Sequence, residues 1–429
     1  MRGIEGALLV WREVLEGGFA SEILRKKAAE MKAEDLTLCS SLVYAALRRF
    51  NLWQDIYSRF IKTEISQKIS DALTIGTAGL LELKHFEPAP LVSGIVNEVR
   101  KFEPKACGLV NAVLRKVEVE GLQLLNKIKS SPIISEKALA AGIPKWVLPL
   151  WLKSWGNDGV NELLSYTNIR PYSSLRVSAT AEPVIMKLRE AGLNAWQSPI
   201  IPKSVRISTT VFPSALPGYA AGEFSPQTES SMMVGSLLSR FYKDGHVLDM
   251  CSGRGVKALQ FAQDRTNASI ECWELSANRI KAAMKEAKRL KAGEKILFRT
   301  GDAMKLEPVK RPSLVLLDAP CSGSGTWNRR PESKLKTNRS TLEGMTKLQT
   351  NLLSRACSLI EPGGVIIYST CSLFREENES IAANALTCGA RFLPLEIKGS
   401  FIKRGSPFGT YILPTLPWLD GFYTAVIMI

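Results

Sequence analysis

The clearest structural signal lies in the second half of the chain, in the stretch VLDMCSGRGVKALQ, residues 247–260. An apolar run leads there into a glycine-containing turn, and a helical pattern follows over residues 258–263. Glycines at such a turn let the backbone approach a ligand at a helix N-terminus, on the edge where doubly wound sheets bind nucleotides. The stretch therefore predicts a Rossmann-like fold with a nucleotide site, although a plain strand-to-helix turn is the alternative.

The surrounding sequence extends this pattern into a whole domain. Strand and helix signals alternate with the spacing of βαβ units, which is typical of a parallel sheet covered on both faces. We assign residues 236–429 to this α/β domain. Its predicted strands are residues 246–251, 269–274, 296–300, 313–319, 364–370 and 422–427.

The part of the chain before this domain has a different pattern of apolar residues. From residue 4 to about 121, apolar residues recur at the three- and four-residue spacing of helices, so we expect an all-α domain over residues 1–130. A connector and a small α+β module are expected over 131–235, with strands at 174–177 and 204–207 and a helix at 183–191. The sequence thus predicts a multi-domain protein.

Length and charge agree with this division. A chain of 429 residues exceeds a single compact core. Its apolar runs stay below the roughly 18 residues of a membrane span, so we expect a cytoplasmic protein without membrane association.

The net charge of +15 favours a nucleic-acid partner over a merely basic surface. The basic residues on the N-terminal helices face either RNA or solvent: Arg48, Arg49, Arg59, Lys62, Arg100, Lys101, Arg115 and Lys116. A monomer is the default expectation.

The number and spacing of cysteines and histidines limit the kinds of metal site and catalysis to be expected. The eight cysteines include no C-x-x-C pair and no short-spaced framework, which argues against zinc and disulfides. The two histidines, His85 and His246, lie in no ligand or nucleophile–base spacing. We therefore expect neither a metal site nor catalysis by histidine.

The turn at residues 253–258 satisfies G-x-G-x-x-A, and Glu274 follows about 20 residues later, placed to bind ribose hydroxyls. This pattern alone would suit NAD as well as S-adenosylmethionine. Asp302 follows the third strand and can reach an adenine amino group, and the fourth strand ends in DAPC, residues 318–321, which a dinucleotide enzyme does not need. We therefore expect S-adenosylmethionine, bound by Cys251, Ser252, Gly253, Arg254, Gly255, Val256, Lys257, Glu274, Asp302 and Asp318.

Two cysteines follow neighbouring strands at this edge. Cys321 comes after the fourth strand and Cys371 after the fifth, and adjacent strands lie about 4.8 Å apart. Methylation of cytosine C5 requires a thiolate that adds to C6, followed by removal of the C5 proton. The pair fits this need, whereas the other cysteines are read as small buried hydrophobes, Cys39, Cys107, Cys272, Cys357 and Cys388.

These segments resemble the RsmB/Sun (Fmu) branch of the RNA 5-methylcytosine methyltransferases over nearly the whole chain. The resemblance includes GLVNAVLR at 108–115, which is similar to the NusB-like RNA-binding domain of that branch, and segments 222–231 and 420–422. It implies methylation of a specific cytosine in 16S ribosomal RNA of the small subunit.

The same resemblance implies residue roles. Cys371 would be the nucleophile, and Cys321 would assist proton abstraction and enzyme release. Asp318 would hold the N3 and N4 edge of the cytosine and border the cofactor, and Lys257 could orient Asp318 or the thiolate. The loop after Cys321 would supply phosphate contacts, Arg329, Arg330 and Lys334.

One departure from the family pattern affects the cofactor turn. The family usually reads Cys-Ala-x-Pro-Gly-Gly-Lys, whereas this chain has Arg254 and Val256 in place of the proline and the second glycine of the pair. Valine restricts φ where glycine does not. The rivals are therefore a non-catalytic RNA-binding or ribosome assembly factor with a weakened cofactor site, a C5-methyltransferase for another RNA, and a DNA cytosine methyltransferase, in which the Pro-Cys cysteine is the nucleophile.

Overall fold

The computed structural model describes residues 2–209 and 211–429. Contacts divide the chain into two compact units. The first runs to Asn168 and also takes in Trp327–Asn338, and the second comprises Ile169–Thr326 and Arg339–Ile429. The segment expected as a connector and small module is therefore shared between the two units. The described residues include no helix that is long and apolar enough to cross a membrane.

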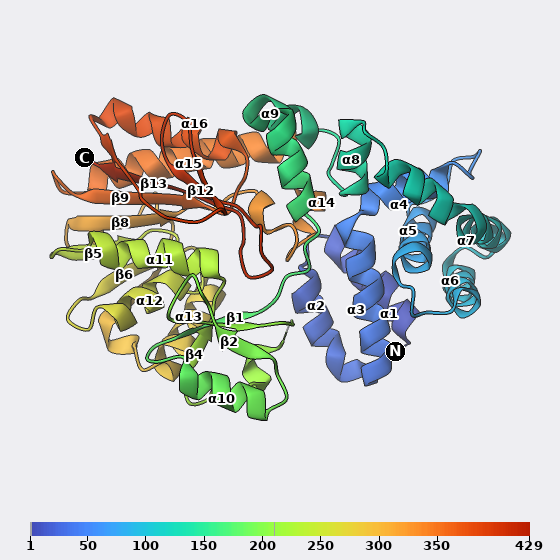
Figure 1. Cartoon of the computed structure of the whole chain (residues 1–429), viewed down its shortest axis with the longest axis horizontal. Helices are drawn as coiled ribbons and strands as arrows, with labels where there is room; N and C mark the ends of the chain where they lie inside the picture. The colour runs from blue at the N-terminus through green and yellow to red at the C-terminus, as the bar shows by residue number, and fades with distance from the viewer. Residues whose placement is uncertain (1, 210) are drawn as a thin grey trace. The chain divides into compact units, whose positions relative to one another are not determined.

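The first unit is helical, as expected for the N-terminal region (Figure 1). The helices between residues 3 and 129 pack apolar residues into a common core that includes Trp11, Leu42, Trp53 and Leu73. Buried apolar stripes of this kind supply most of the stability of such helices. The helices are α1 (Gly3–Leu15), α2 (Ala20–Lys27), α3 (Ala33–Arg48), α4 (Phe50–Ser58), α5 (Gln67–Glu82), α6 (Pro88–Phe102), α7 (Cys107–Lys129), α8 (Ile134–Ala140) and α9 (Val147–Tyr166).

A segment from late in the chain completes this helical unit. Trp327 is buried and stacks on Trp151 with 5.8 Å between ring centroids. Lys334, in the short helix α14 (Ser333–Lys336), is 2% exposed, and its Nζ donates to the carbonyl oxygen of Arg48 at 2.5 Å. The expectation that Lys334 contacts phosphate is therefore wrong, because its ammonium is buried and already bonded within the protein.

The second unit begins with a small antiparallel sheet in the order β2-β3-β1-β4. The predicted strands and helix of the α+β module are confirmed as β1, β3 and α10, whereas β2 and β4 were not predicted. Their bounds are β1 (Ser174–Val177), β2 (Ala195–Gln197), β3 (Ser204–Ile207), β4 (Phe224–Pro226) and α10 (Glu182–Glu190).

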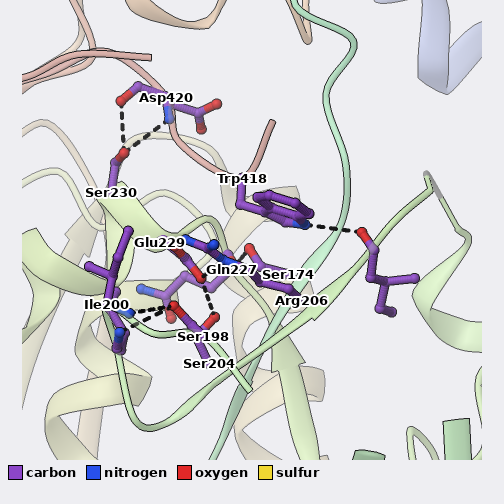
Figure 2. A network of polar contacts seen from close by, with 12 residues as sticks. Ser174, Ser198, Ile200, Ser204, Arg206, Gln227, Glu229, Ser230, Trp418 and Asp420 are labelled. Carbon is purple, nitrogen blue, oxygen red and sulfur yellow. Dashed lines mark hydrogen bonds and ion pairs between the residues drawn. The ribbon is translucent and has the colours of Figure 1, made fainter. Parts of the chain in front are cut away.

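A buried polar network joins this small sheet to the rest of the unit (Figure 2). The guanidinium of Arg206 donates to both carboxylate oxygens of Glu229 at 2.8 and 2.6 Å. Glu229 begins helix α11 (Glu229–Phe241). Arg206 also lies over the ring of Trp418 at 4.5 Å, and Trp418 Nε1 donates to the carbonyl of Ile207. Elements far apart in the sequence are thereby fixed to one another.

The large sheet has the order β11-β12-β13-β9-β8-β5-β6-β7, with β10 beside β13. Strands β5 to β9 are parallel, and β13 runs antiparallel to β9. Every strand predicted for this domain is present, and the expected Rossmann-like fold is confirmed. The bounds are β5 (His246–Asp249), β6 (Ile270–Glu274), β7 (Ile296–Thr300), β8 (Pro312–Asp318), β9 (Val365–Thr370), β10 (Arg391–Leu393), β11 (Ile402–Arg404), β12 (Thr410–Ile412) and β13 (Phe422–Met428).

Helices cover both faces of this sheet (Figure 1). On one face α11, α12 (Val256–Asp264) and α13 (Ala277–Arg289) close a core with Val247, Ile270 and Leu316. On the other face lie α15 (Arg339–Leu359) and α16 (Glu379–Ala382). Because β5, β6, β8 and β9 are parallel, their C-terminal ends meet at one edge, where the residues singled out in the sequence are found.

Candidate active site

The two cysteines lie together at this edge. Cys321 follows β8, Cys371 follows β9, and their sulfur atoms are 3.3 Å apart. The strands are neighbours, with Asp318 paired to Ser369. Both thiols are half-buried. The hydrogen bond with Cys371, followed by burial, raises the pKa of Cys321 well above its ordinary value.

The loop that carries Cys321 is held on both sides of the cysteine. The backbone N–H of Ser322 donates to Glu377 Oε1 at 2.8 Å, and the Ser322 hydroxyl donates to Oε2 at 2.5 Å. Gln349, on α15, donates from Nε2 to the carbonyl of Pro320 at 2.8 Å and to Glu377 at 3.0 Å. Glu377 and Gln349 are fully buried, so this clamp is shielded from solvent.

A second clamp holds the residues on either side of Cys371. Thr370 Oγ1 donates to Asn378 Oδ1 at 2.5 Å, and Asn378 Nδ2 donates to the carbonyl of Ser372 at 2.9 Å. Asn378 is fully buried and directly follows Glu377. Neither clamp was recognised in the sequence.

Lys257 connects the cofactor turn to the cysteine edge. Its Nζ donates to Asp318 Oδ2 at 2.5 Å and lies 5.3 Å from the centre of the Phe422 ring. Burial opposes the charge on Lys257, but the carboxylates of Asp318 and Asp249 and the sulfur of Cys371 together raise its pKa. The lysine is therefore a cation that is ion-paired with Asp318.

The glycine turn has the backbone that its sequence predicts. Gly253 and Gly255 have φ of +58° and +71°, and Gly255 caps α12. Val256 is the first residue of α12, and Lys291 is the only non-glycine residue of the described chain with positive φ. Valine at position 256 therefore causes no backbone strain, which removes the conformational reason for doubting the cofactor site.

Two of the expected cofactor residues lie at neighbouring strand ends, and one of them contacts this turn. Glu274 ends β6 and accepts from the backbone N–H of Gly253 at 3.0 Å. Asp302 follows the adjacent strand β7, and the N–H of Gly301 donates to the carbonyl of Glu274, which ties the two strand ends together. Two carboxylates on neighbouring strand ends suit the hydroxyl and amino groups of an adenosine moiety.

Asp249 adds an acceptor beside the turn. It is 2% exposed, and its Oδ1 has no hydrogen-bond partner among the described residues. Burial, with a smaller contribution from Asp318, raises its pKa to about 7. A ligand that carries an ammonium group would satisfy this oxygen, so the residues present fit S-adenosylmethionine.

Several basic residues for which the sequence left RNA or solvent as alternatives are engaged in ion pairs on the helical unit. Arg59 pairs with Asp55 at 2.8 Å, and Arg115 pairs with Glu118 at 2.8 Å. Lys101 pairs with both Glu5 and Glu98. All three side chains remain about half exposed. Part of the positive charge of this surface is therefore balanced locally.

The parallel sheet, the glycine turn and the carboxylates at successive strand ends define a class I methyltransferase that uses S-adenosylmethionine. Residues 238–428 match the model of a family described as 16S rRNA methyltransferase RsmB/F, and residues 8–119 match the NusB family. The catalytic domain therefore matches the RsmB/F methyltransferases, as the sequence motifs indicated, and a NusB domain precedes it.

Individual relatives agree with this assignment. The chain is 28% identical to ribosomal RNA small subunit methyltransferase B of Thermus thermophilus, over 98% of this chain and 96% of that protein. It is 26% identical to the protein of that name from Xanthomonas campestris, over 92% and 89%. The crystal structure of PH0851 has the same fold, with a TM-score of 0.80, 21% identity and coverage of 99% of this chain and 98% of that chain.

Proposed function

We propose that this protein transfers the methyl group of S-adenosylmethionine to C5 of a specific cytosine in 16S ribosomal RNA, through a covalent bond between Cys371 and C6. The observation that carries the proposal is the pair of half-buried thiols, 3.3 Å apart, at the ligand edge of the sheet. The names of the curated relatives supply the small-subunit ribosomal RNA as the substrate.

Cys371 begins the reaction. Its thiolate forms a bond to C6, and the electron pair of the C5–C6 double bond moves to C5, which then attacks the methyl carbon. The cofactor supplies an electrophilic methyl group on a positively charged sulfur. Lys257 lies close enough to Cys371 for the sulfur to raise the pKa of the lysine.

Asp318 holds the base. Addition of sulfur to C6 makes N3 more basic, and N3 takes up a proton from water. The N3–H and N4–H groups can then donate to the Asp318 carboxylate, whose Oδ2 is held by Lys257. This arrangement orients the cytosine and stabilises the positive charge that develops on it.

Cys321 completes the cycle. In its thiolate form it takes the proton from C5, the electron pair of that bond restores the C5–C6 double bond, and Cys371 leaves as a thiolate. The sulfur separation of 3.3 Å places the two groups close enough to act on adjacent carbons of one ring.

The substrate must be an unpaired, unstacked cytosine, because a duplex hides C5 and C6 from a thiol at a strand end. The helical unit matches the NusB family. We propose that it docks neighbouring RNA, and we place the protein in the cytoplasm as a monomer. The substitution at Val256 no longer favours a non-catalytic assembly factor, since its backbone is unstrained.

The test is bisulfite sequencing of total RNA from a strain that lacks this gene, complemented with wild-type protein, Cys371→Ala or Cys388→Ala. Cys388 is an exposed thiol elsewhere in the catalytic domain and serves as the matched control. We expect one 16S cytosine to regain methylation with wild type and Cys388→Ala only. Methylation by Cys371→Ala would overturn the mechanism, and restoration at a transfer RNA or at DNA instead would overturn the substrate.

A further inference from the structure

The clamp at Cys371 is part of a longer chain of buried hydrogen bonds. Asn378, the N-cap residue of α16, bonds through Oδ1 to the Thr370 hydroxyl and through Nδ2 to the carbonyl of Ser372. Its Nδ2 also donates to the phenol oxygen of Tyr411 at 3.2 Å. Tyr411 lies on β12, so a short antiparallel strand is linked to the residues on either side of the cysteine.

The phenol of Tyr411 has a fixed direction. Its hydroxyl donates to Glu379 Oε2 at 2.5 Å, and its oxygen accepts from Asn378. Burial, followed by the charge of Glu379, raises the pKa of Tyr411 well above its ordinary value. The phenol therefore keeps its proton and uses it on Glu379, which leaves the lone pairs of its oxygen for the Asn378 amide.

The direction of the phenol sets the orientation of the Asn378 amide. An amide has two donor hydrogens on its nitrogen and acceptor lone pairs on its oxygen, so turning it over exchanges donors for acceptors. In the turned orientation Oδ1 would face the carbonyl of Ser372 and the oxygen of Tyr411, and neither could donate to it while Tyr411 donates to Glu379. The observed orientation lets Nδ2 donate to both and leaves Oδ1 for the Thr370 hydroxyl.

These hydrogen bonds are shielded from water. Thr370, Ser372 and Asn378 are fully buried, and Tyr411 and Glu379 are 3% and 5% exposed. A buried donor or acceptor that loses its partner gains no bond to solvent. Removal of one hydroxyl from the chain of bonds therefore leaves its neighbours unsatisfied unless they move.

We propose that Tyr411 is a positioning residue for Cys371. By holding the Asn378 amide in one orientation, its phenol fixes the backbone on both sides of the cysteine and thereby the place of the attacking sulfur beside Cys321. The separation of 3.3 Å between the two sulfur atoms is the distance that this arrangement maintains. The role of Tyr411 in methyl transfer rests on the proposed function, but the fixed sulfur position is a property of the protein without RNA.

The first experiment separates the chemical step from binding in Tyr411→Phe. This change removes one oxygen atom and keeps the ring, so the packing of β12 is retained. We expect kcat for methylation of 16S RNA to fall about tenfold, because a small misplacement of a nucleophile slows its attack. The KM values for S-adenosylmethionine and RNA should stay within about twofold of wild type, since the displaced group acts in the chemical step.

Tyr423→Phe is the matched control. Tyr423 lies on the neighbouring strand β13, and its ring centroid is 5.0 Å from that of Tyr411. It is also buried, but its hydroxyl donates to the carbonyl of Phe408 and not to the Cys371 clamp. This variant loses a hydrogen bond of the same kind and should keep the wild-type kcat. An equal fall in kcat for both variants, or an unchanged kcat in Tyr411→Phe, would overturn the proposal.

A second measurement needs neither RNA nor cofactor. Phenylarsine oxide condenses with two neighbouring thiols, forming two As–S bonds and releasing one water, so its affinity reports whether the two sulfur atoms are held side by side. Mass spectrometry after digestion assigns the adduct to Cys321 and Cys371. We expect Tyr411→Phe to bind the reagent several-fold more weakly than wild type, and Tyr423→Phe to bind it equally well. Equal affinity in all three proteins would overturn the proposal, whereas a wild type that binds the reagent but methylates no RNA would count only against the proposed function.

Glu379→Met tests the same hydrogen bonds from their other end if Tyr411→Phe does not fold, as judged by circular dichroism. Without the acceptor on Glu379, the phenol of Tyr411 can turn its hydrogen towards the amide of Asn378. Both kcat and the affinity for phenylarsine oxide should then fall as expected for Tyr411→Phe. Unchanged values in a folded Glu379→Met protein would overturn the proposal.

Discussion

Cys321 and Cys371 occupy similar positions after neighbouring strands, and the sequence was sufficient to pair them. Parallel strands bring their C-terminal ends to one edge, so two residues just past β8 and β9 must lie close together. The side chains that hold them could not be predicted in the same way. Gln349 lies in the middle of α15, and its contact with Pro320 depends on how that helix packs on the sheet.

At the cofactor turn, the structure removes a concern that the sequence raised about a single residue. Valine in place of glycine suggested a restricted backbone at position 256. The structure places Val256 in the first turn of α12, while Gly253 and Gly255 take the positive φ angles. A family pattern does not state which of its glycines needs unusual dihedral angles, and the structure does.

At the scale of elements, apolar runs were enough to predict the strands of the parallel sheet. Strands buried on both faces read as continuous apolar segments, as in β8 and β9. The short strands β2, β4, β10, β11 and β12 were missed because three residues are too few to show alternation. Their pairing depends on neighbours distant in the sequence.

The small sheet depends on one buried ion pair, which gives a prediction of stability. Arg206→Ala leaves Glu229 buried without its partner, which costs about 3–5 kcal/mol in the free energy of unfolding. Urea denaturation followed by circular dichroism measures this loss. Arg206 and Glu229 are 5% and 0% exposed, so solvent cannot replace the missing charge.

Lys187→Ala is the control for that measurement. Lys187 pairs with Glu223 in the same small sheet region, but its side chain is 45% exposed. Its removal should cost less than about 1 kcal/mol. Equal losses for Arg206→Ala and Lys187→Ala would show that the buried pair has no special role.

At the scale of the whole molecule, residues 327–338 belong to the helical unit, although the chain on either side of them belongs to the second unit. They follow the Cys321 loop in sequence, yet Trp327 and Lys334 are buried in the helical unit. The sequence suggested a basic loop at the surface. The charges of this segment can be read from the sequence, whereas its packing against distant residues cannot. The expected domain boundaries likewise treated this segment as part of the catalytic domain.

Lys334 makes the stability of the helical unit depend on pH. Burial, with Arg49 and Arg48 nearby, lowers its pKa to about 7. The unfolded chain, with an ordinary lysine pKa of about 10.4, then binds more protons than the folded protein between these values. The contribution of Lys334 to stability is therefore most unfavourable below pH 7 and improves as the pH rises towards about 10.

Lys334→Met should accordingly stabilise the protein most near pH 6, with a gain that shrinks as the pH rises. Thermal unfolding from pH 6 to 10 gives the difference from wild type at each pH. Lys62→Met, at an exposed lysine of the same unit, should show a difference that does not vary with pH. A constant difference for Lys334→Met would mean that the buried lysine keeps its ordinary pKa.

The division of labour between the two cysteines is tested most directly by trapping the covalent intermediate. Cys321→Ala removes the group that takes the C5 proton, so Cys371 cannot leave. Incubated with S-adenosylmethionine and 16S RNA, this variant should form a protein–RNA adduct that survives denaturing electrophoresis. Mass spectrometry of the digested adduct should find the nucleotide on Cys371, and Cys321→Ala/Cys371→Ala should form none. Wild-type turnover by Cys321→Ala without an adduct, or a nucleotide on another cysteine, would contradict the account.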